Sequence, residues 1–302
     1  MAFYGSPVQG PPPPRKRMRL RRSPPAPRAF PPYPMPAPVA PLPAGLPYAP
    51  DTPVGATRWV AVIGADHDAG TTTVAALLSL AYATHRRYRI VAVDAQPVAG
   101  ALGARLATQG AGGIAQVAAA DVSSFDALSP FLDQSAEGMW ALTGATSTAP
   151  EPEQCRVVMG MLSQYFAVGV LDCGSLGTPL VETVLDLAHA HLLVAPATPE
   201  GVLSAAGALD WLGARQNSTE PWHCGVALVS TSRHPDTDVG WATRLLSGRG
   251  GRAIPVPYDS GLVAGRISPA SVSDGTWAAA RRLASEMLSR AARPRAQRWG
   301  EG

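Results

Sequence analysis

Short apolar runs alternate along the chain with longer segments in which apolar residues recur at helical spacing. Each run is rich in valine, alanine or leucine and is bounded by polar residues or glycine, which is typical of strands buried in a parallel sheet. We expect strands at 59–63, 90–94, 139–142, 167–172, 191–195, 225–230 and 253–256, the third being the weakest. We expect helices at 71–84, 151–166, 179–189, 200–215, 237–247 and 275–292. Alternating strands and helices predict an α/β fold with a doubly wound, mostly parallel sheet that helices cover on both faces.

Proline dominates the N-terminal segment. Eighteen of the 31 prolines lie at or before Pro53. Proline lacks a backbone donor and breaks helices and central strands, so this segment cannot build a packed core. We therefore predict three parts: a disordered or polyproline-II-like Pro/Arg-rich tail over 1–57, one folded domain over 58–293, and a short basic C-terminal tail over 294–302.

The net charge of +3 is unevenly distributed. The first fifty residues contain no acid and seven basic residues: Arg15, Lys16, Arg17, Arg19, Arg21, Arg22 and Arg28. Lys16 is the only lysine of the chain, and the remainder of the chain is net acidic. The cluster Arg15–Arg22 directly follows four prolines. It is either a solvated linker or a docking arm for an acidic protein surface, an anionic membrane or nucleic acid.

Cysteine usage and hydropathy indicate the compartment. Cys155, Cys173 and Cys224 are far apart and odd in number, which excludes a disulfide framework and a zinc-ligand spacing. No apolar run approaches the roughly 20 residues that span a bilayer. Prolines follow the N-terminal basic run where a signal peptide needs an apolar stretch. We expect a cytoplasmic protein, either free or held peripherally at the membrane by its basic tail.

A glycine-flanked loop joins the first strand to the first helix. Residues 64–73 have the sequence GADHDAGTTT. A phosphate-binding loop, G-x-x-x-x-G-K-[ST], occupies this place in P-loop proteins, where its backbone amides hold phosphate and its lysine neutralises charge. Gly64, Gly70, Thr72 and Thr73 fit a loop of this kind, but Thr71 stands where the lysine belongs.

Residues 60–78 resemble the opening of the ParA/MinD family of ATPases, whose deviant loop is K-G-G-x-G-K-T-T. In this alignment Asp66 replaces the signature lysine, and His67 and Asp68 replace the two glycines. Gly70, Thr72 and Thr73 are kept, while Thr71 replaces the second lysine.

Three later segments strengthen the resemblance, which covers roughly 58–292. Residues 93–100 are similar to the D-x-[DN]-P-x-x-G switch region, with Asp94 at the first acidic position and Gln96 at the second. Residues 168–174 are similar to the Walker-B strand with its D-C-G ending, in which Asp172 is the magnesium-associated acid. Residues 254–259 are similar to the late loop that borders adenine, which places Pro255 and Pro257 there. The Pro-rich leader and these motifs look most like actinobacterial members, some of which, such as EspI-like proteins, accompany type VII secretion.

The resemblance implies a site for ATP and magnesium. The residues of the loop predict that this site does not bind ATP. In the family, one lysine binds phosphates in its own subunit and the signature lysine reaches the partner's ATP across a dimer. Asp66 and Asp68 bring negative charge to the same place. Two unit charges about 4 Å apart interact by roughly 4 kcal/mol at an intermediate dielectric, which is worth several powers of ten in affinity. We predict a vestigial loop, no bound cofactor and no catalytic residue.

If the loop does bind ATP, the residues that the family uses for ATP and magnesium should form the site. It would take ATP and magnesium as cofactors, with Thr72 and Asp172 at the metal and Asp94 and Asp172 as the family-equivalent acids. The missing cation would have to come from an arginine elsewhere, such as Arg58, Arg86 or Arg87. A separate metal site formed by Asp66, His67 and Asp68 with Asp94 or Asp172 matches no named ligand spacing, so we favour a polar surface loop.

Three functions remain open. The first is a non-hydrolysing binding or regulatory module in intracellular positioning or a type VII secretion-type assembly, with protein partners on the domain surface and the tail, and with a homodimer as an option. The second is an active, divergent ATPase that positions a chromosome or a complex. The third is a scaffold whose tail binds membrane or DNA through Arg15–Arg22. Some relatives end in a membrane-targeting helix, but the ordinary length of 275–292 predicts that this helix packs on the sheet.

Overall fold

The structure is a computed structural model. It describes residues 57–85, 89–96, 101–144, 149–216, 224–233, 237–263 and 265–292. Several predicted segments lie outside the described residues. They are the expected Pro/Arg-rich tail as far as residue 56, including Arg15–Arg22, the C-terminal tail 294–302, the end of the switch segment at 97–100, and Arg86 and Arg87.

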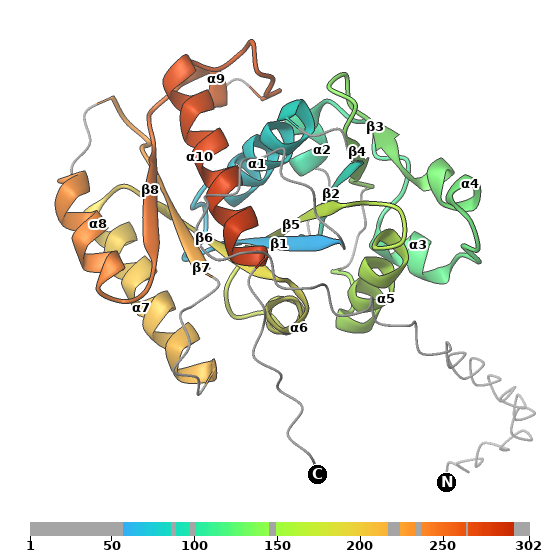
Figure 1. The fold of residues 1–302 in the computed structure, drawn as a ribbon, viewed down its shortest axis with the longest axis horizontal. Coiled ribbons are helices and arrows are strands. Elements are labelled where there is room, and N and C mark those ends of the chain that lie inside the picture. The colour runs from blue at the N-terminus through green and yellow to red at the C-terminus, as the bar shows by residue number, and fades with distance from the viewer. Residues whose placement is uncertain are drawn as a thin grey trace, which may run out of the picture. The chain divides into compact units, whose positions relative to one another are not determined.

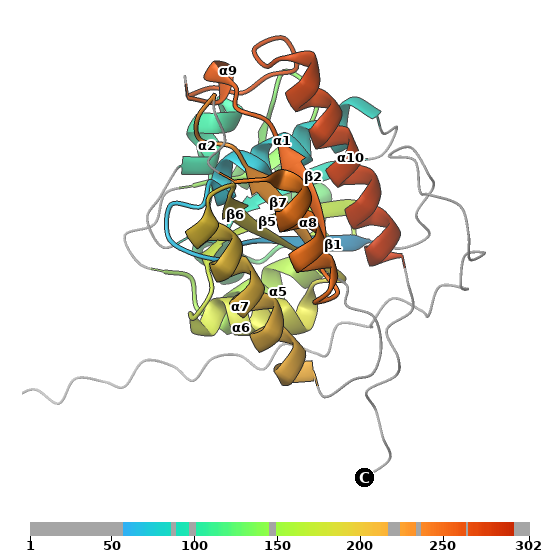
Figure 2. The same ribbon diagram turned by 90° about the vertical axis from the view of Figure 1, so that its left-hand side faces the viewer.

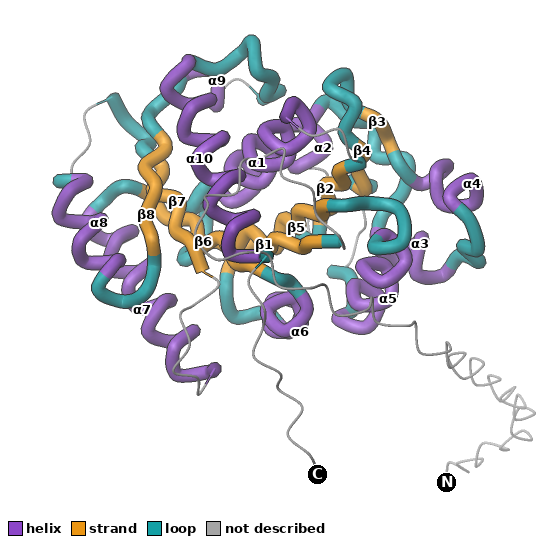
Figure 3. Tube along the Cα trace, viewed as in Figure 1, coloured by secondary structure: helices purple, strands orange, loops and turns teal. Residues whose placement is uncertain are grey.

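A single eight-stranded sheet forms the centre of the domain, in the order β3-β4-β2-β5-β1-β6-β7-β8 (Figures 1 and 3). Its strands are β1 (Arg58–Gly64), β2 (Ile90–Asp94), β3 (Asp133–Gln134), β4 (Trp140–Leu142), β5 (Val168–Ser175), β6 (Ala190–Pro196), β7 (Cys224–Val229) and β8 (Arg252–Val256). All neighbouring strands are parallel except β3 and β4. β1 lies between β5 and β6, so both of its edges are hydrogen-bonded.

Helices cover both faces of this sheet. They are α1 (Thr71–His85), α2 (Ala101–Leu106), α3 (Ile114–Ala119), α4 (Phe125–Leu128), α5 (Pro152–Leu162), α6 (Pro179–Leu187), α7 (Pro199–Gln216), α8 (Val239–Ser247), α9 (Ser260–Val263) and α10 (Asp274–Ala291), with a 3₁₀ turn η1 (Ser129–Phe131). One core cluster packs α1, α2 and α10 on one face of the sheet. A second cluster packs α3, α5, α6, α7 and α8 on the opposite face. Figure 2 shows α5, α6 and α7 together on one side and α1 and α10 on the other.

Alternation along the central strand explains the two cores. In β1, Val60 and Val62 enter the cluster under α1 and α10, whereas Trp59, Ala61 and Ile63 enter the other. Successive side chains of a strand point to opposite faces, so a strand that is apolar throughout is buried on both. The sequence pattern therefore requires two helical layers.

Side-chain caps start several of the helices. The Oγ1 of Thr178 accepts the Val181 amide at the start of α6, and Ser273 does the same for Thr276 in α10. Asp238 accepts two amides at the start of α8. Such caps satisfy amides that the first turn of a helix leaves unpaired.

The predicted fold class is confirmed, and each predicted strand and helix is present within a few residues. Sequence periodicity missed α2, α3, α4, β3 and α9, because each of these elements is too short to show a period. The packing expected of the last helix is also confirmed, since Leu283, Met287 and Leu288 of α10 are buried against the sheet. Among the described residues, no helix combines the length and the apolar character that crossing a membrane requires.

Candidate functional site

The loop between β1 and α1 lies at the carboxyl end of the sheet. Its start is anchored on both sides, because the Ala65 amide donates to the Val194 carbonyl at 2.8 Å and the Leu176 amide donates to the Gly64 carbonyl at 3.2 Å. These bonds come from β6 and from the end of β5. In open α/β sheets, ligands bind in the crevice outside the carboxyl ends of the strands, and this loop occupies that position.

Glycine is required at both ends of the loop. A Cβ atom at Gly64 would lie 2.7 Å from the Asp66 carbonyl oxygen and 2.8 Å from Thr71 Oγ1. Gly70 has a φ of +87°, in the left-handed region. Asp68 also has a positive φ, +57°, which is uncommon for a residue with a side chain. The backbone therefore keeps a tight turn even though aspartate has entered it.

The side chains of this turn are acidic and exposed. Asp66, His67 and Asp68 are all exposed, and His67 Nδ1 lies 3.2 Å from Ser175 Oγ. Asp66 Oδ1 accepts the His67 amide at 2.7 Å. Within the described ranges, no ion pair joins an arginine to Asp66 or Asp68. The loop thus presents carboxylates to solvent without a paired cation from those ranges.

Arg58 cannot supply the missing cation. It begins β1, whereas the loop follows Gly64 at the other end of that strand. Seven strand residues at about 3.3 Å each put roughly 20 Å between the two ends. The Arg58 Nη1 donates instead to the Thr57 carbonyl. Arg58, one of the three arginines that the sequence left open as a source of the cation, therefore does not reach the loop.

Two buried aspartates lie behind the loop. Asp94 of β2 and Asp172 of β5 are directly opposite in the parallel register, and the Ala95 amide donates to the Asp172 carbonyl at 2.9 Å. Asp94 is partnered, because its carboxylate accepts the amides of Gln96 at 3.1 Å and Leu102 at 3.4 Å. The strand register therefore brings together the two acids that the resemblance singled out.

Asp172 is the less satisfied acid. It is fully buried, and neither carboxylate oxygen has a hydrogen-bond partner among the described residues. Burial, together with the nearby charge of Asp94, raises the pKa of this carboxyl to about 7. Thr72, Gln96 and the Gly174 amide lie close enough to oppose part of this rise in pKa, although none reaches hydrogen-bonding geometry. An unpartnered buried carboxyl is a place where a proton or a cation would be held.

Thr72 faces the same corner. Its Oγ1 accepts a hydrogen bond from Gln96 Nε2 at 2.7 Å. Oxygen ligands of this kind are those that magnesium prefers, so Thr72 and Asp172 fit the metal half of a Mg-ATP site. The loop itself offers no side-chain cation to a triphosphate, because residues 64–73 contain no lysine or arginine and two aspartates. In the part of the chain that the structure describes, no group of three or more His, Cys, Asp or Glu could hold a metal ion by itself.

A hollow of about 500 Å³ lies at the ends of β7 and β8. Ser230, Ser232, Arg233, Pro257, Tyr258, Asp259, Ser260 and Ser273 line it. It adjoins the loop, since a Cβ at Gly70 would lie 3.9 Å from Val229, the residue before Ser230. Pro257 lines this hollow, whereas Pro255 is within β8 and outside the lining. Sequence reasoning missed Arg233, whose guanidinium lies 5.9 Å from the centroid of the Tyr258 ring.

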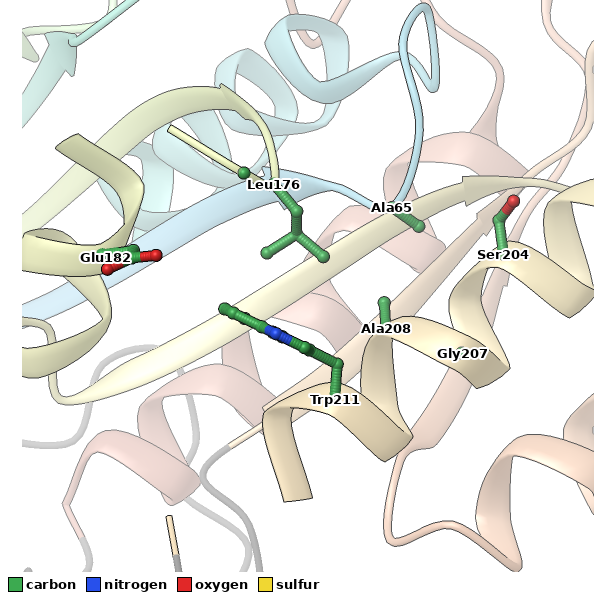
Figure 4. Close-up of a pocket in the computed structure, with 8 residues that line it drawn as sticks. Ala65, Leu176, Glu182, Ser204, Gly207, Ala208 and Trp211 are labelled. Carbon is green, nitrogen blue, oxygen red and sulfur yellow. The ribbon is translucent and has the colours of Figure 1, made fainter. Parts of the chain in front are cut away.

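A second hollow of about 490 Å³ lies between α6 and α7 and reaches the loop at Ala65 (Figure 4). Its lining includes Leu176, Glu182, Gly207 and Trp211. Sequence analysis gave this surface no role. The available signal was the spacing of Leu203, Gly207 and Trp211, which places them four residues apart on one helical face, away from the buried side of α7.

Comparison with known proteins agrees with this architecture. No protein-family profile matches the chain. The ParA family ATPase of Chlorobium tepidum superposes with a TM-score of 0.61 at 14% identity, over 76% of this chain and 98% of that one. The MinD cell division ATPase of Pyrococcus furiosus also gives 0.61, at 17% identity over 77% of this chain and 98% of that one. The chain therefore has the fold of the ParA and MinD ATPases.

The curated relatives add a second similarity. The ESX-1 secretion-associated protein EspI of two Mycobacterium tuberculosis strains is 27% identical over 226 residues, which cover 68% of this chain. The same match covers 32% of EspI, so the chain spans about a third of the length of these relatives.

Proposed function

We propose that this chain is a non-hydrolysing binding module built on a ParA/MinD-type fold, and that it works by engaging protein partners in a secretion-associated assembly. The observation that carries the proposal is the loop after β1, which occupies the phosphate-binding position and presents Asp66 and Asp68 in place of a cation. The similarity to EspI, a protein described as ESX-1 secretion-associated, supports the choice of setting.

Electrostatics supports the loss of hydrolysis. A triphosphate brings several negative charges, and phosphoryl transfer relies on cations that neutralise them in the transition state. A repulsion of even 1.4 kcal/mol lowers affinity about tenfold, and an exposed pair of carboxylates at about 4 Å can supply that much after solvent screening. The loop keeps the backbone turn of a phosphate-binding loop but presents negative charge where such a loop presents positive charge.

A second candidate is an active, divergent ATPase. It is favoured by the pairing of Thr72 with Gln96 beside the unpartnered Asp172, which together retain a corner suited to magnesium. In this case a cation would have to reach the loop from another chain or from a residue outside the described ranges.

Nucleotide titration of the full chain separates the two. Labelled ATP is titrated with and without magnesium, phosphate release is measured in parallel, and an active MinD serves as the positive control. We expect no saturable binding below millimolar ATP and no phosphate release above the buffer. Magnesium-dependent binding in the micromolar range, or hydrolysis abolished by Asp172→Asn, would refute the proposal and establish the second candidate.

The tail is tested separately. If residues 1–53 carry the binding to membrane or DNA, deleting them should abolish a steeply salt-dependent association with anionic vesicles or duplex DNA. Association that is retained after the deletion would instead place the contact on the folded domain. A homodimer is tested by sedimentation of the full chain, in which we expect no dependence on ATP.

A further inference from the structure

The groove between α6 and α7 combines an apolar floor with an exposed indole. Trp211 is 41% exposed and Leu203, on the same face of α7, is 61% exposed. Figure 4 shows the Leu176 side chain pointing toward the Trp211 indole, with α7 contributing Ala208 and Gly207 alongside. Small residues beside one flat aromatic ring leave a trough in which an extended backbone can lie.

One carboxylate lines this groove and another follows a lining residue in the chain. Ala65 lines the groove and the exposed Asp66 follows it directly. Glu182 lines the groove with a side chain that is 52% exposed. Arg215 of α7 bridges to α6 through Glu182 at 3.5 Å and Asp186 at 3.4 Å. This bridge pairs Glu182 with a cation, whereas no ion pair within the described residues reaches Asp66 or Asp68.

We propose that this groove and the acidic loop beside it bind a proline-rich segment that carries arginines, presented by another polypeptide chain. Polyproline-II segments dock in aromatic-lined grooves because they lose little entropy on binding and present flat rings to the indole. Arginines that flank the prolines would pair with Asp66 and Asp68. The inference rests on the proposed function, since a loop engaged with phosphates could not also receive arginine.

Charge complementarity on the chain itself supports this occupant. Residues 11–22 have the sequence PPPPRKRMRLRR, in which four prolines precede a run of basic residues and no acid occurs. This sequence is therefore an example of the ligand class that the groove fits, and a peptide made from it is a direct probe. A second copy of the chain could present it.

The test measures binding of a labelled synthetic peptide covering residues 9–22 to the full-length chain by fluorescence anisotropy. The receiving chain carries serine in place of its own basic residues at 15–22, so that its leader does not compete. We expect saturable binding that weakens as salt is raised. A peptide with serine for Pro11–Pro14 keeps the charge and should bind at least tenfold more weakly.

Three variants assign the site. Trp211→Ala should weaken binding at least tenfold. Gly207→Leu should do the same by filling the groove, and it should fold, because a Cβ at Gly207 meets nothing within 4 Å and leucine favours a helix. The control is Trp241→Ala in α8, which removes an equally exposed indole (40%) outside the groove and should leave binding unchanged.

Charge variants complete the assignment. Asp66→Asn with Asp68→Asn should weaken binding about fivefold and flatten its salt dependence. Equal binding of the proline and serine peptides, or binding unaffected by both groove variants, would overturn the inference. Because no nucleotide is present, this failure is distinct from failure of the proposed function, which would appear as Mg-ATP binding in the titration above.

Discussion

Replacing Asp172 by asparagine removes a carboxyl that the fold buries completely and leaves without a hydrogen-bond partner in the described ranges. Its pKa is raised to about 7 in the folded protein, from its ordinary value of 3.8. Between these two values the unfolded chain has released the proton and the folded chain keeps it. The free energy of unfolding therefore falls as pH rises through this window, and the stabilisation present below pH 4 is lost above pH 7.

The size of the effect follows from the shift in pKa. Three pKa units at 1.36 kcal/mol each correspond to about 4 kcal/mol, which is the upper limit of the loss. Asparagine has nearly the same shape and no proton to release, so Asp172→Asn should not lose this stability. At pH 8 we expect the variant to unfold at a higher temperature than the parent, by up to about 10 °C for a domain of this size.

Circular dichroism melts at pH 5, 6, 7 and 8 check this. The two proteins should converge toward pH 5 and diverge toward pH 8. Asp121→Asn, which changes an exposed aspartate that precedes α4, serves as the control and should follow the parent at every pH. A parent that is at least as stable as Asp172→Asn at pH 8 would refute the reasoning, because it would mean that Asp172 is ionised and well compensated in the fold.

Three further changes are predicted. Thr71→Lys alone should not create measurable ATPase activity in a phosphate-release assay, because the two loop aspartates remain; hydrolysis in this single variant would contradict the electrostatic argument. Gly169→Ala should lower the free energy of unfolding by about 1–3 kcal/mol in urea melts, since the new Cβ would lie 2.1 Å from the Trp59 ring and force the core to shift. Tyr82→Phe should cost about 1 kcal/mol, because it removes the buried hydrogen bond from the phenol to the Ala284 carbonyl at 3.0 Å; an unchanged melting curve would assign that bond no net value.

The central strands were predictable because burial on both faces leaves a continuous apolar run. Ile90 to Val93 and Val168 to Leu171 are such runs, and each ends in an aspartate at the carboxyl edge. Parallel pairing places these two aspartates opposite each other, so the acidic corner followed from strand order and ordinary register. By contrast, the region 101–134 holds short helices and a two-residue strand, which carry too few turns for a period to appear.

Long-range geometry limited the prediction of the site. Arg58 looked available in sequence and lies at the opposite end of its strand. Arg233 and Trp211 come from loops and helices far along the chain, and their roles depend on how α6, α7 and the end of β7 are placed in space. Local sequence predicts each of these elements. The hollows between the elements depend on how the folded sheet places them in space, which local sequence does not give.

The position of β1 has a consequence for how such a protein can change. Because the start of its loop is held by backbone bonds to two neighbouring strands, with the His67–Ser175 contact as one side-chain addition, the exposed residues between Ala65 and Ala69 contribute less than the backbone to holding it in place. A site of this construction can exchange one class of ligand for another by surface substitution, without rebuilding the scaffold. Engineers could use the same freedom, grafting new recognition chemistry onto three consecutive side chains while the sheet beneath them stays intact.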